Sequence, residues 1–537
     1  MFSSSIRVRD GLAVVGLGKW RARYTVLRAE LTYGPTSVYD SARFSAVARC
    51  LLLLASTALS ILVSGYRLDD LLVYLPLTLH LGDPSLYPGS PLIQQLEAMP
   101  YPAYRAYAVA FDQRVLFGIF VMSRAALLLS LWALGRQIVG HTLPVLVGVA
   151  LLVVTPGWFG TLGGTSLVQA EPNQFALATP LCLFALAASL AGRFGLAFAL
   201  AGLGLNLQPI IGAAVMSFLA VDVLVDKVIR QRQMRAWAAL RNIGIGVIVA
   251  IPLLVETLVG LGNRLVHQPS DYLEFVKFAA FYQIFPSTFL RTEYASSVIV
   301  ALVAVLALRR GVACKQRFVL ILWLATIAGF CAVGTVFSEL VPIGLVLQLM
   351  PFRATLFLKI IGLFLCAALV WRSVEHSRMG KPVVLGLTIA MIVAALTVAQ
   401  PIHIPGVSPA SDLELAGSWA QRNTAVDALF VTPPDASVAG FMFFSERSTL
   451  GDYKLDSLAV WGPAFGHDAY ARLDAQGCSG PWNPWCVQNR YGTLTTADFL
   501  GLNQRFGTCY ALTNVGQEVQ LPLVYQNSTY RMYALCS

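Results

Sequence analysis

The chain has 537 residues, of which 57% are hydrophobic and only 12% are charged. A soluble globular chain is typically about 25% charged, so too few polar residues remain here to cover a water-facing surface. The net charge of +10 would suit nucleic-acid binding in a soluble protein, but the Lys and Arg residues lie mostly in short loops between apolar blocks, as the positive-inside rule of membrane proteins requires.

The first 44 residues form a basic lead-in to the first apolar block. Its seven Lys and Arg residues are Arg7, Arg9, Lys19, Arg21, Arg23, Arg28 and Arg43. The segment is too long and too basic for an ordinary cleaved signal peptide. We therefore predict that residues 1–44 stay in the cytoplasm and that the first block is a retained membrane anchor.

Apolar blocks follow one another through the next part of the chain and predict a transmembrane module over residues 45–400. Eleven spans are predicted, at about 45–65, 115–135, 141–158, 174–192, 194–206, 209–226, 242–260, 296–308, 318–337, 354–371 and 382–400. An odd number of spans from a cytoplasmic N-terminus places the C-terminus outside. Every predicted inside loop is then basic, as the positive-inside rule expects.

Two predicted outer loops are long, at residues 66–114 and 261–295. Within the first, the stretch Leu92–Met99 alternates apolar and polar residues and suits a short helix lying in the membrane interface. The fifth and sixth spans are separated only by Asn206–Pro209, which predicts a hairpin bent at that turn.

From residue 401 on, the composition becomes that of a soluble protein, and the helix, turn and strand patterns of residues 401–537 predict a small α/β or α+β domain. Four cysteines fall here: Cys478, Cys486, Cys509 and Cys536. Four cysteines in one extracytoplasmic domain suggest two disulfides, in any of three pairings. The predicted fold class is therefore a polytopic α-helical membrane protein with a C-terminal extracytoplasmic soluble α/β domain.

Three acidic residues are candidates for chemistry on the outer side. Asp69 and Asp70 follow directly after the first span, where carboxylates near the bilayer are costly and usually functional. One of them could act as a general base or help hold a divalent cation; the alternative is a solvated pair at a helix end. Glu171 could be a further acid facing the same cavity, or could complement the dipole of the span that begins near Asn173.

Cations also gather at the outer ends of the spans. Arg353 enters the tenth span from outside, against the positive-inside pattern, and Arg291 and His267 lie on the same side. Such a group suits a lipid phosphate, while snorkelling to headgroups is the alternative. A transporter would carry its charges at mid-span, so charges at the outer span ends favour an enzyme. The sequence contains no H-E-x-x-H, Walker A, G-x-S-x-G or zinc pattern.

Six features together resemble the GT-C integral membrane glycosyltransferases. They are the Asp69-Asp70 pair, the long first outer loop, the Leu207-Gln208-Pro209 turn, the loop at 282–287, the segment from Gln348 to Arg353, and a C-terminal outside domain. The tail segments 444–448 and 525–533 also look like segments of bacterial members of uncharacterised specificity. The resemblance covers nearly the whole chain, although its motifs are short.

The resemblance implies transfer of a sugar from a polyprenyl-phosphate-linked donor to a glycan, lipid or protein acceptor, on the extracytoplasmic face of a bacterial inner (plasma) membrane. It implies that Asp69 or Asp70 is the catalytic base and that Arg353, Arg291 and His267 hold the donor phosphate. Some members need a divalent metal such as Mg²⁺ or Mn²⁺ and others do not, so the cofactor stays unknown. Many relatives place His before Pro at the turn, where this chain has Gln208, which puts a proton-transfer role there in doubt.

Three other functions remain open on the sequence. A flippase or transporter of lipid-linked glycans would show related halves as well as charges at mid-span. A ligase acting on a lipid-linked glycan would carry a large outer loop late in the chain. A scaffold or receptor that displays the C-terminal domain would tolerate loss of Asp69 and Asp70.

Overall fold

The structure is a computed structural model. It describes residues 46–66, 68–97, 113–164, 166–255, 283–312, 316–377, 379–397, 408–435, 440–451, 463–478 and 490–536, together with residues 273, 276, 277, 402 and 438. For Asp69 and Asp70 it describes the backbone and not the side chains. His267 and Cys486 lie outside the described residues.

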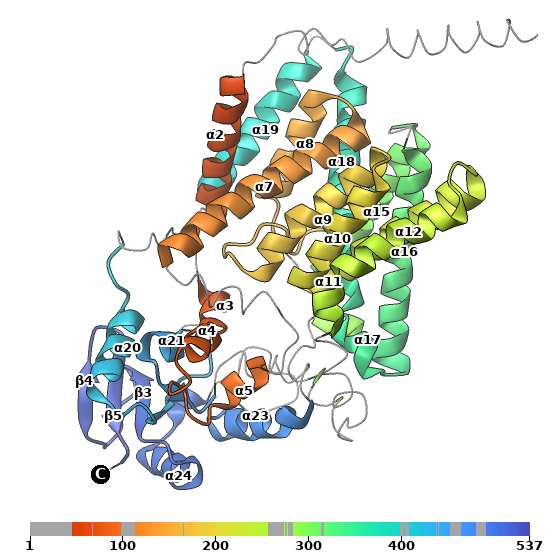
Figure 1. The fold of residues 1–537 in the computed structure, drawn as a ribbon. Helices are drawn as coiled ribbons and strands as arrows, with labels where there is room; N and C mark the ends of the chain where they lie inside the picture. The colour runs from red at the N-terminus through yellow and green to blue at the C-terminus, as the bar shows by residue number, and fades with distance from the viewer. Residues whose placement is uncertain are drawn as a thin grey trace, which may run out of the picture.

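Eleven helices pack side by side in the upper part of the molecule (Figure 1). They are α2 (Ala46–Ser64), α7 (Gln113–Val139), α8 (Thr142–Val154), α9 (Gln174–Leu190), α10 (Phe194–Leu207), α11 (Pro209–Val221), α12 (Ala236–Val249), α15 (Arg291–Arg309), α16 (Arg317–Thr335), α18 (Thr355–Val374) and α19 (Gly380–Thr397). Each predicted span overlaps one of them, although the seventh, predicted at 242–260, shares only residues 242–249 with α12. π-Helical turns extend α11 and α16, at η1 (Asp222–Arg230) and η3 (Val336–Leu340).

Membrane-spanning character is clear for part of this bundle. Within the described ranges, six helices are long and apolar enough to cross a membrane: Arg114–Val139, Pro209–Arg230, Arg291–Arg309, Arg317–Leu340, Val346–Val374 and Gly380–Thr397. Shorter apolar helices, of 10–17 residues, occupy the other five predicted spans. On α15 and α19 apolar residues such as Leu302 and Leu387 are exposed, as expected of helices that face lipid. Eleven crossings remain a prediction.

The predicted hairpin between the fifth and sixth spans is present. Gln208 is the one extended residue between α10 and α11, and its side chain accepts a hydrogen bond from Ile210 N at 3.4 Å. The two helices approach so closely that a Cβ atom on Gly212 would lie 2.4 Å from Leu205 Cα. Gln208 is therefore a buried helix cap, and the structure gives it a structural role.

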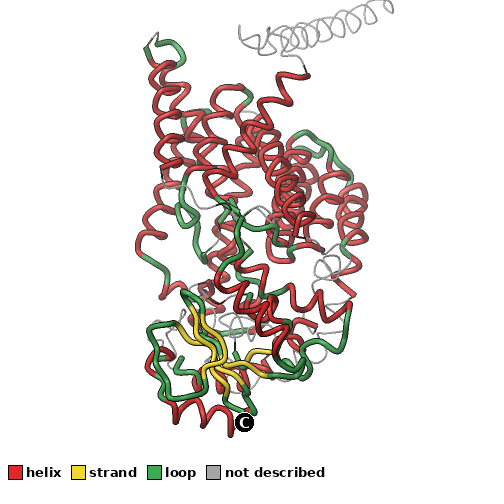
Figure 2. The backbone as a smooth tube through the Cα atoms, turned by 90° about the vertical axis from the view of Figure 1, so that its left-hand side faces the viewer, coloured by secondary structure: helices red, strands yellow, loops and turns green. Residues whose placement is uncertain are grey.

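The C-terminal domain contains a five-stranded mixed sheet, seen in yellow in Figure 2. Its strands are β1 (Leu429–Val431), β2 (Ser448–Thr449), β3 (Tyr510–Asn514), β4 (Leu523–Gln526) and β5 (Tyr530–Ala534), in the order β2-β1-β3-β5-β4. β1 is parallel to β2 and β3, with Phe430 opposite Tyr510, while β5 is antiparallel to both of its neighbours. The mixed α/β prediction for this part of the chain agrees with this sheet.

Strand alternation gives the sheet two apolar faces. Phe430 and Leu512 pack against α20 (Asp412–Asn423) on one face. Val431 and Ala511, their chain neighbours, pack on the other face against α24 (Thr496–Phe506). Each of these helices begins with a capping box, which satisfies amide groups of its first turn.

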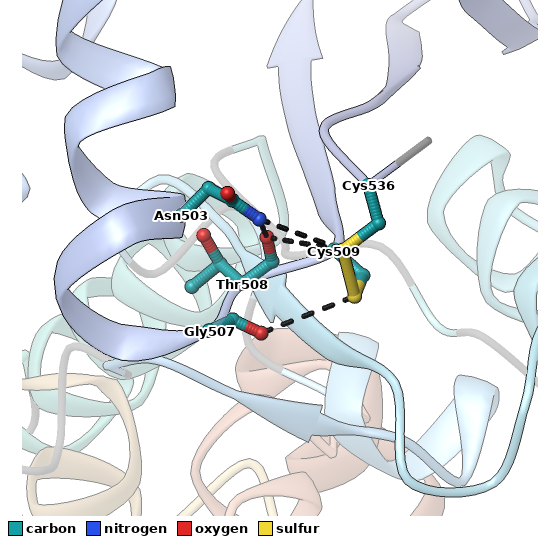
Figure 3. The surroundings of a disulfide bond; sticks show 5 residues. All are labelled: Asn503, Gly507, Thr508, Cys509 and Cys536. Atoms are coloured by element: carbon teal, nitrogen blue, oxygen red, sulfur yellow. Dashed lines mark hydrogen bonds between the residues drawn. A yellow bond between two sulfur atoms is a disulfide. The ribbon is translucent and has the colours of Figure 1, made fainter.

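A disulfide joins Cys509, at the start of β3, to Cys536, after β5 (Figure 3). Beside it, Asn503 Nδ2 of α24 donates a hydrogen bond to Thr508 O at 2.6 Å. Cys478 is also disulfide-bonded. The Cys509–Cys536 bond rules out two of the three predicted pairings.

Three short helices of the loop after α2, predicted to be the first outer loop, lie between the bundle and the C-terminal domain (Figure 1). They are α3 (Asp69–Leu72), α4 (Leu75–Gly82) and α5 (Pro91–Glu97). Leu92, Ile93 and Leu96 of α5 are buried in a cluster that also contains Met442 of α21 (Phe441–Ser445) and Ala469 of α23 (Pro463–Ala475). The Leu92–Met99 stretch is helical through Glu97, but the prediction of an interfacial helix is wrong, because protein rather than lipid covers its apolar residues.

Candidate functional site

Helix α3 carries the acidic pair to the junction between the helical bundle and the C-terminal domain. It begins at Asp69, and Leu71 and Leu72 are buried in the cluster that joins the two parts. Gly440, at the start of α21, lies directly against Leu72, since a Cβ atom on that glycine would be 2.6 Å from Leu72 Cδ1. The backbone of α3, which contains Asp69 and Asp70, therefore packs directly against the C-terminal domain.

Glu171 lies at the same place. Its Oε2 accepts a hydrogen bond from the backbone N–H of Leu71 at 2.8 Å, although the two residues are 100 positions apart. The carboxylate is buried. The cap of the neighbouring helix α9 comes from Asn173, which accepts a hydrogen bond from Ala176 N at 3.0 Å. Glu171 thus connects the chain before α9 to the helix that bears the acidic pair.

Tyr66 forms the wall beside this acidic group. It is only 1% exposed and packs against Phe117 and Phe120 of α7, with ring centroids 5.0 and 4.9 Å away. Burial and the nearby Glu171 carboxylate raise the pKa of the Tyr66 phenol well above its ordinary value. The hydroxyl therefore stays protonated, and it has no hydrogen-bond partner among the described residues.

A buried arginine stands on α7 next to this wall. Arg124 is 3% exposed, its Nη2 donates a hydrogen bond to Gln169 O, and its guanidinium lies 5.1 Å from the centroid of the Phe120 ring. Gln169 is two residues before Glu171. A buried cation within a long apolar helix therefore bonds to the chain two residues before Glu171, and charges in such helices usually mark a site.

Residues 155–173, which connect α8 to α9, form a non-helical segment that we call the 155–173 segment. It is held by buried side chains of the bundle: Lys359 Nζ of α18 donates to Pro156 O at 2.7 Å, and Thr355 Oγ1 accepts from Leu162 N at 2.8 Å. Non-helical backbone at membrane depth is tolerated only where protein buries it or where it lines a cavity. The segment meets this condition, because Lys359 and Thr355 are both buried.

Arg353 lies in a second polar group, which also includes Gln283. Its Nη2 donates a hydrogen bond to Gln283 Oε1 at 2.8 Å, so the structure brings together the 282–287 loop and the segment from Gln348 to Arg353. Gly163 of the 155–173 segment lies against the Gln283 carbonyl, which would be 3.0 Å from a Cβ atom there. Met350, just before the 3-10 turn η4 (Pro351–Ala354) that contains Arg353, has φ of +43°. Strain of this kind in a residue other than glycine often marks a functional segment.

Arg291 is less engaged than Arg353. Arg291 is exposed at the first residue of α15 and forms no hydrogen bond or ion pair with the described residues. The neighbouring loop is fixed by Glu339, whose Oε1 accepts from Ser287 N at 2.9 Å. His267 lies outside the described residues, so its predicted role stays a prediction.

An apolar cavity of about 630 Å³ runs between α15, α16 and α18. Leu162, Tyr294 and Thr355 line its end near Arg353, and Arg309 and Arg317 line the opposite end. Most of the wall is aliphatic, with residues such as Ala301, Val305 and Ile321. We call this cavity the α15–α18 groove. Its lining is that of a site for a hydrocarbon chain rather than for a polar solute.

Metal binding is not decided by these groups. No cluster of three or more His, Cys, Asp or Glu residues occurs among the side chains that the structure describes. The carboxylates of Asp69 and Asp70 do not belong to that set.

Sequence reasoning missed two buried cations, Arg124 and Lys359. The prediction that charges lie at the outer ends of spans is wrong for both, because each is buried within a long apolar helix. The available signal was a single basic residue inside a predicted span, at 115–135 and at 354–371. Such a residue is costly in lipid and therefore indicates an internal role.

No protein-family model and no curated protein matches the chain. Among solved structures, the chain is similar to the oligosaccharyltransferase of Archaeoglobus fulgidus, whose crystal structure contains a tethered acceptor peptide. The two share 11% sequence identity with a TM-score of 0.43, over 88% of this chain and 69% of the other. A similarity of this degree does not assign the chain to a family.

Proposed function

We propose that this protein is a membrane glycosyltransferase that moves a sugar from a polyprenyl-phosphate-linked donor to an acceptor at the outer face of the membrane. The observation that carries the proposal is the hydrogen bond from Leu71 N to Glu171 Oε2. Through this bond a buried acid of the 155–173 segment contacts the short helix that contains Asp69 and Asp70. Neighbouring acids with different environments are typical of acid–base chemistry.

In this proposal Asp69 or Asp70 is the general base that takes the proton from the acceptor hydroxyl. A carboxylate is one of the side chains that accept a proton in general base catalysis, and this pair lies at the start of α3. Glu171 holds the start of α3 and adds negative charge beside the pair. Like charges near one another raise the pKa of a carboxyl group, which brings a base closer to the working pH.

The donor side is assigned to Arg353, supported by Gln283 and joined by Arg291 and His267. Positive charge there would stabilise the phosphate that leaves the sugar. The α15–α18 groove supports a lipid-linked donor, because its apolar wall reaches Thr355, two residues from Arg353. By their spacing of three, Arg291 and Tyr294 lie on the same face of α15, and Tyr294 lines the groove.

The test is sugar transfer in cells that lack the chromosomal copy and carry wild type, Asp69→Asn, Asp70→Asn or Arg353→Ala at matched expression. The cell-surface glycan profile is read by mass spectrometry. Asp83→Asn is the matched control, since Asp83 belongs to the same outer loop, is exposed, and bonds only locally to Ser85. One Asp variant of the pair should behave like the deletion while Asp83→Asn behaves like wild type. Wild-type profiles from both variants of the pair would end the proposal.

The second candidate function is a transporter of lipid-linked glycans. The observation that favours it is the length of the α15–α18 groove, which reaches Arg309 and Arg317 at the end far from Arg353. A transporter moves its substrate without a general base. Full function of the Asp69→Asn and Asp70→Asn variants, together with loss of function when the groove is filled by Ala301→Trp, would support the transporter.

A further inference from the structure

Arg124 is a buried charge within the described part of the bundle. It lies eleven residues after the start of α7, or about three helical turns, and is 3% exposed. A guanidinium in such a place normally has a carboxylate partner. Among the described residues none lies within ion-pair distance of Arg124, and its Nη1 has no hydrogen-bond partner.

The one hydrogen bond that Arg124 makes leads directly to the acidic group. Its Nη2 donates to Gln169 O, and the Gln169 side chain closes the turn by donating to Ser166 O at 2.6 Å. Glu171 follows two residues later and accepts from Leu71 N. A continuous path therefore runs from α7 through the turn at Gln169–Glu171 to helix α3.

We propose that Arg124 is a positioning residue that anchors the Gln169–Glu171 turn against α3 and thereby fixes the helix that carries Asp69 and Asp70. A forked guanidinium suits this task, because it holds a carbonyl in a fixed direction while it stacks on the Phe120 ring. Arg124 also places a buried positive charge on the carbonyl of Gln169, two residues before Glu171. The consequence for catalysis rests on the proposed function, whereas the anchoring itself does not.

Lys359 provides a matched comparison. It is also a buried cation, 1% exposed, and it also donates to a carbonyl of the 155–173 segment, at Pro156. Pro156 is at the opposite end of the segment from Gln169. Replacing either Arg124 or Lys359 by an uncharged residue removes a buried positive charge. Only the replacement of Arg124 releases the end of the 155–173 segment that contacts α3.

The first test is hydrogen–deuterium exchange of the full chain in lipid nanodiscs, for wild type, Arg124→Met, Arg124→Lys and Lys359→Met. Arg124→Met should speed exchange in the peptide that contains Leu71 by about tenfold, a change of about 1.4 kcal/mol. Arg124→Lys should give a smaller increase. Lys359→Met should leave that peptide unchanged and instead speed exchange near Leu162, whose amide bonds to Thr355.

The second test uses the same samples with a panel of synthetic polyprenyl-phosphate-linked hexoses and pentoses. Arg124→Met should lower kcat at least tenfold and move the acid limb of the pH–rate profile to higher pH, because a positive charge near a base favours its ionised form. The groups around that base are Glu171, Tyr66, and Asp69 or Asp70 from α3. Arg124→Lys keeps the charge, so it should keep the wild-type position of this limb.

The outcomes separate the two proposals. Unchanged exchange at Leu71 in a folded Arg124→Met protein overturns the anchoring role. If exchange responds as expected but wild type transfers no sugar from any donor, the anchoring stands and the glycosyltransferase proposal fails. Should Arg124→Met not fold, Arg124→Lys against Lys359→Met gives the same comparison, since lysine lacks the forked geometry.

Discussion

At the scale of single residues, the site depends on polar groups that are buried and paired across long sequence separations. Glu171 bonds to Leu71 N, Arg353 to Gln283, and Lys359 to Pro156 O. A buried group that loses its partner retains the full cost of its desolvation. Substitutions at these positions should therefore separate loss of charge from loss of a hydrogen bond.

Glu171 allows this separation most directly. Glu171→Ala removes the acceptor for the Leu71 N–H, whose residue is fully buried, and should lower the free energy of unfolding by about 1–3 kcal/mol. Glu171→Gln keeps an oxygen in the same place and should be the less destabilised variant. Thermal unfolding of both proteins measures the difference. Equal destabilisation would show that the charge, and not the hydrogen bond, matters at this position.

Asp412 gives a prediction for pH dependence outside the membrane bundle. It accepts hydrogen bonds from the Ser528 and Thr529 hydroxyls at the turn between β4 and β5, and these bonds lower the pKa of its carboxyl group. A lowered pKa contributes stability at pH values above the unfolded pKa of about 3.9, and that contribution is lost as the pH falls through the folded value.

We therefore expect Asp412→Asn to destabilise the protein at neutral pH. The difference in stability between this variant and wild type should become smaller below about pH 4. Exchange protection of α20 across this pH range is the measurement. Arg422→Gln is a control on the same helix, because the Arg422 side chain bonds to Ser418 O within α20 and not to the turn between β4 and β5. A gap that is constant with pH would contradict the assignment.

At the scale of elements, the sequence was sufficient for the helices and insufficient for their connections. Long apolar runs place all eleven bundle helices, because run length and hydrophobicity are local properties. The 155–173 segment and α5 depend instead on partners far along the chain, such as Thr355 for Leu162 and Met442 for the α5 cluster. Arg124 is visible in the sequence as a single basic residue inside a predicted span, but its partner Gln169, 45 positions away, is not.

The candidate site divides in the same way. Asp69, Asp70, Glu171 and Arg353 were singled out because charges near the bilayer are costly and usually functional. For Glu171 the sequence left two roles open, an acid facing the same cavity or a charge at the start of α9, and the bond to Leu71 N depends on how the 155–173 segment folds. The α5 prediction was wrong because the sequence does not show which surface, lipid or protein, covers an amphipathic stretch.

Contact between α3 and α21 can be tested at Gly440. This residue has φ of +94°, and a Cβ atom there would lie 2.6 Å from Leu72 Cδ1. Gly507 is the matched control: it has φ of +72° and open space around its Cβ position. Both substitutions to Ala carry the cost of a left-handed backbone, about 1 kcal/mol, but only Gly440→Ala also displaces Leu72.

We expect Gly440→Ala to be more destabilising than Gly507→Ala by about 1–3 kcal/mol, the usual cost of overpacking. Thermal unfolding measures stability, and sugar transfer reports whether α3 has moved. If the two glycine variants are equally stable and equally active, the packing of α21 on α3 does not support the site.

At the scale of the whole molecule, the C-terminal domain and the outer side of the bundle form one unit around α3, α4 and α5. The pairing of Tyr66 with Ile402 adds a backbone link at the same junction. Because the C-terminal domain packs against α3, sugar transfer outside the cytoplasm requires that this domain also lies outside the cytoplasm. The number of membrane crossings decides that point: the domain is outside if the number is odd and the N-terminus is cytoplasmic.

The Cys509–Cys536 disulfide allows the location of the C-terminal domain to be measured, because disulfides persist in oxidising compartments and are rare in the cytosol. In cells, both cysteines should resist alkylation until a reductant is added, and they should then react with a membrane-impermeant maleimide. Cys331, which is free and partly buried in α16, is the control that should not react with that reagent. Immediate alkylation only in lysed cells would place the domain in the cytoplasm and imply an even number of crossings.

The same bond should stabilise the domain. It connects residues 27 positions apart, for which the chain-entropy model gives about 3–4 kcal/mol. A Cys509→Ser, Cys536→Ser double variant should therefore unfold at lower temperature than wild type when both are oxidised and match it under reducing conditions. Because the domain holds α3 from below, the variant should also lose sugar transfer at temperatures where the bundle helices remain folded.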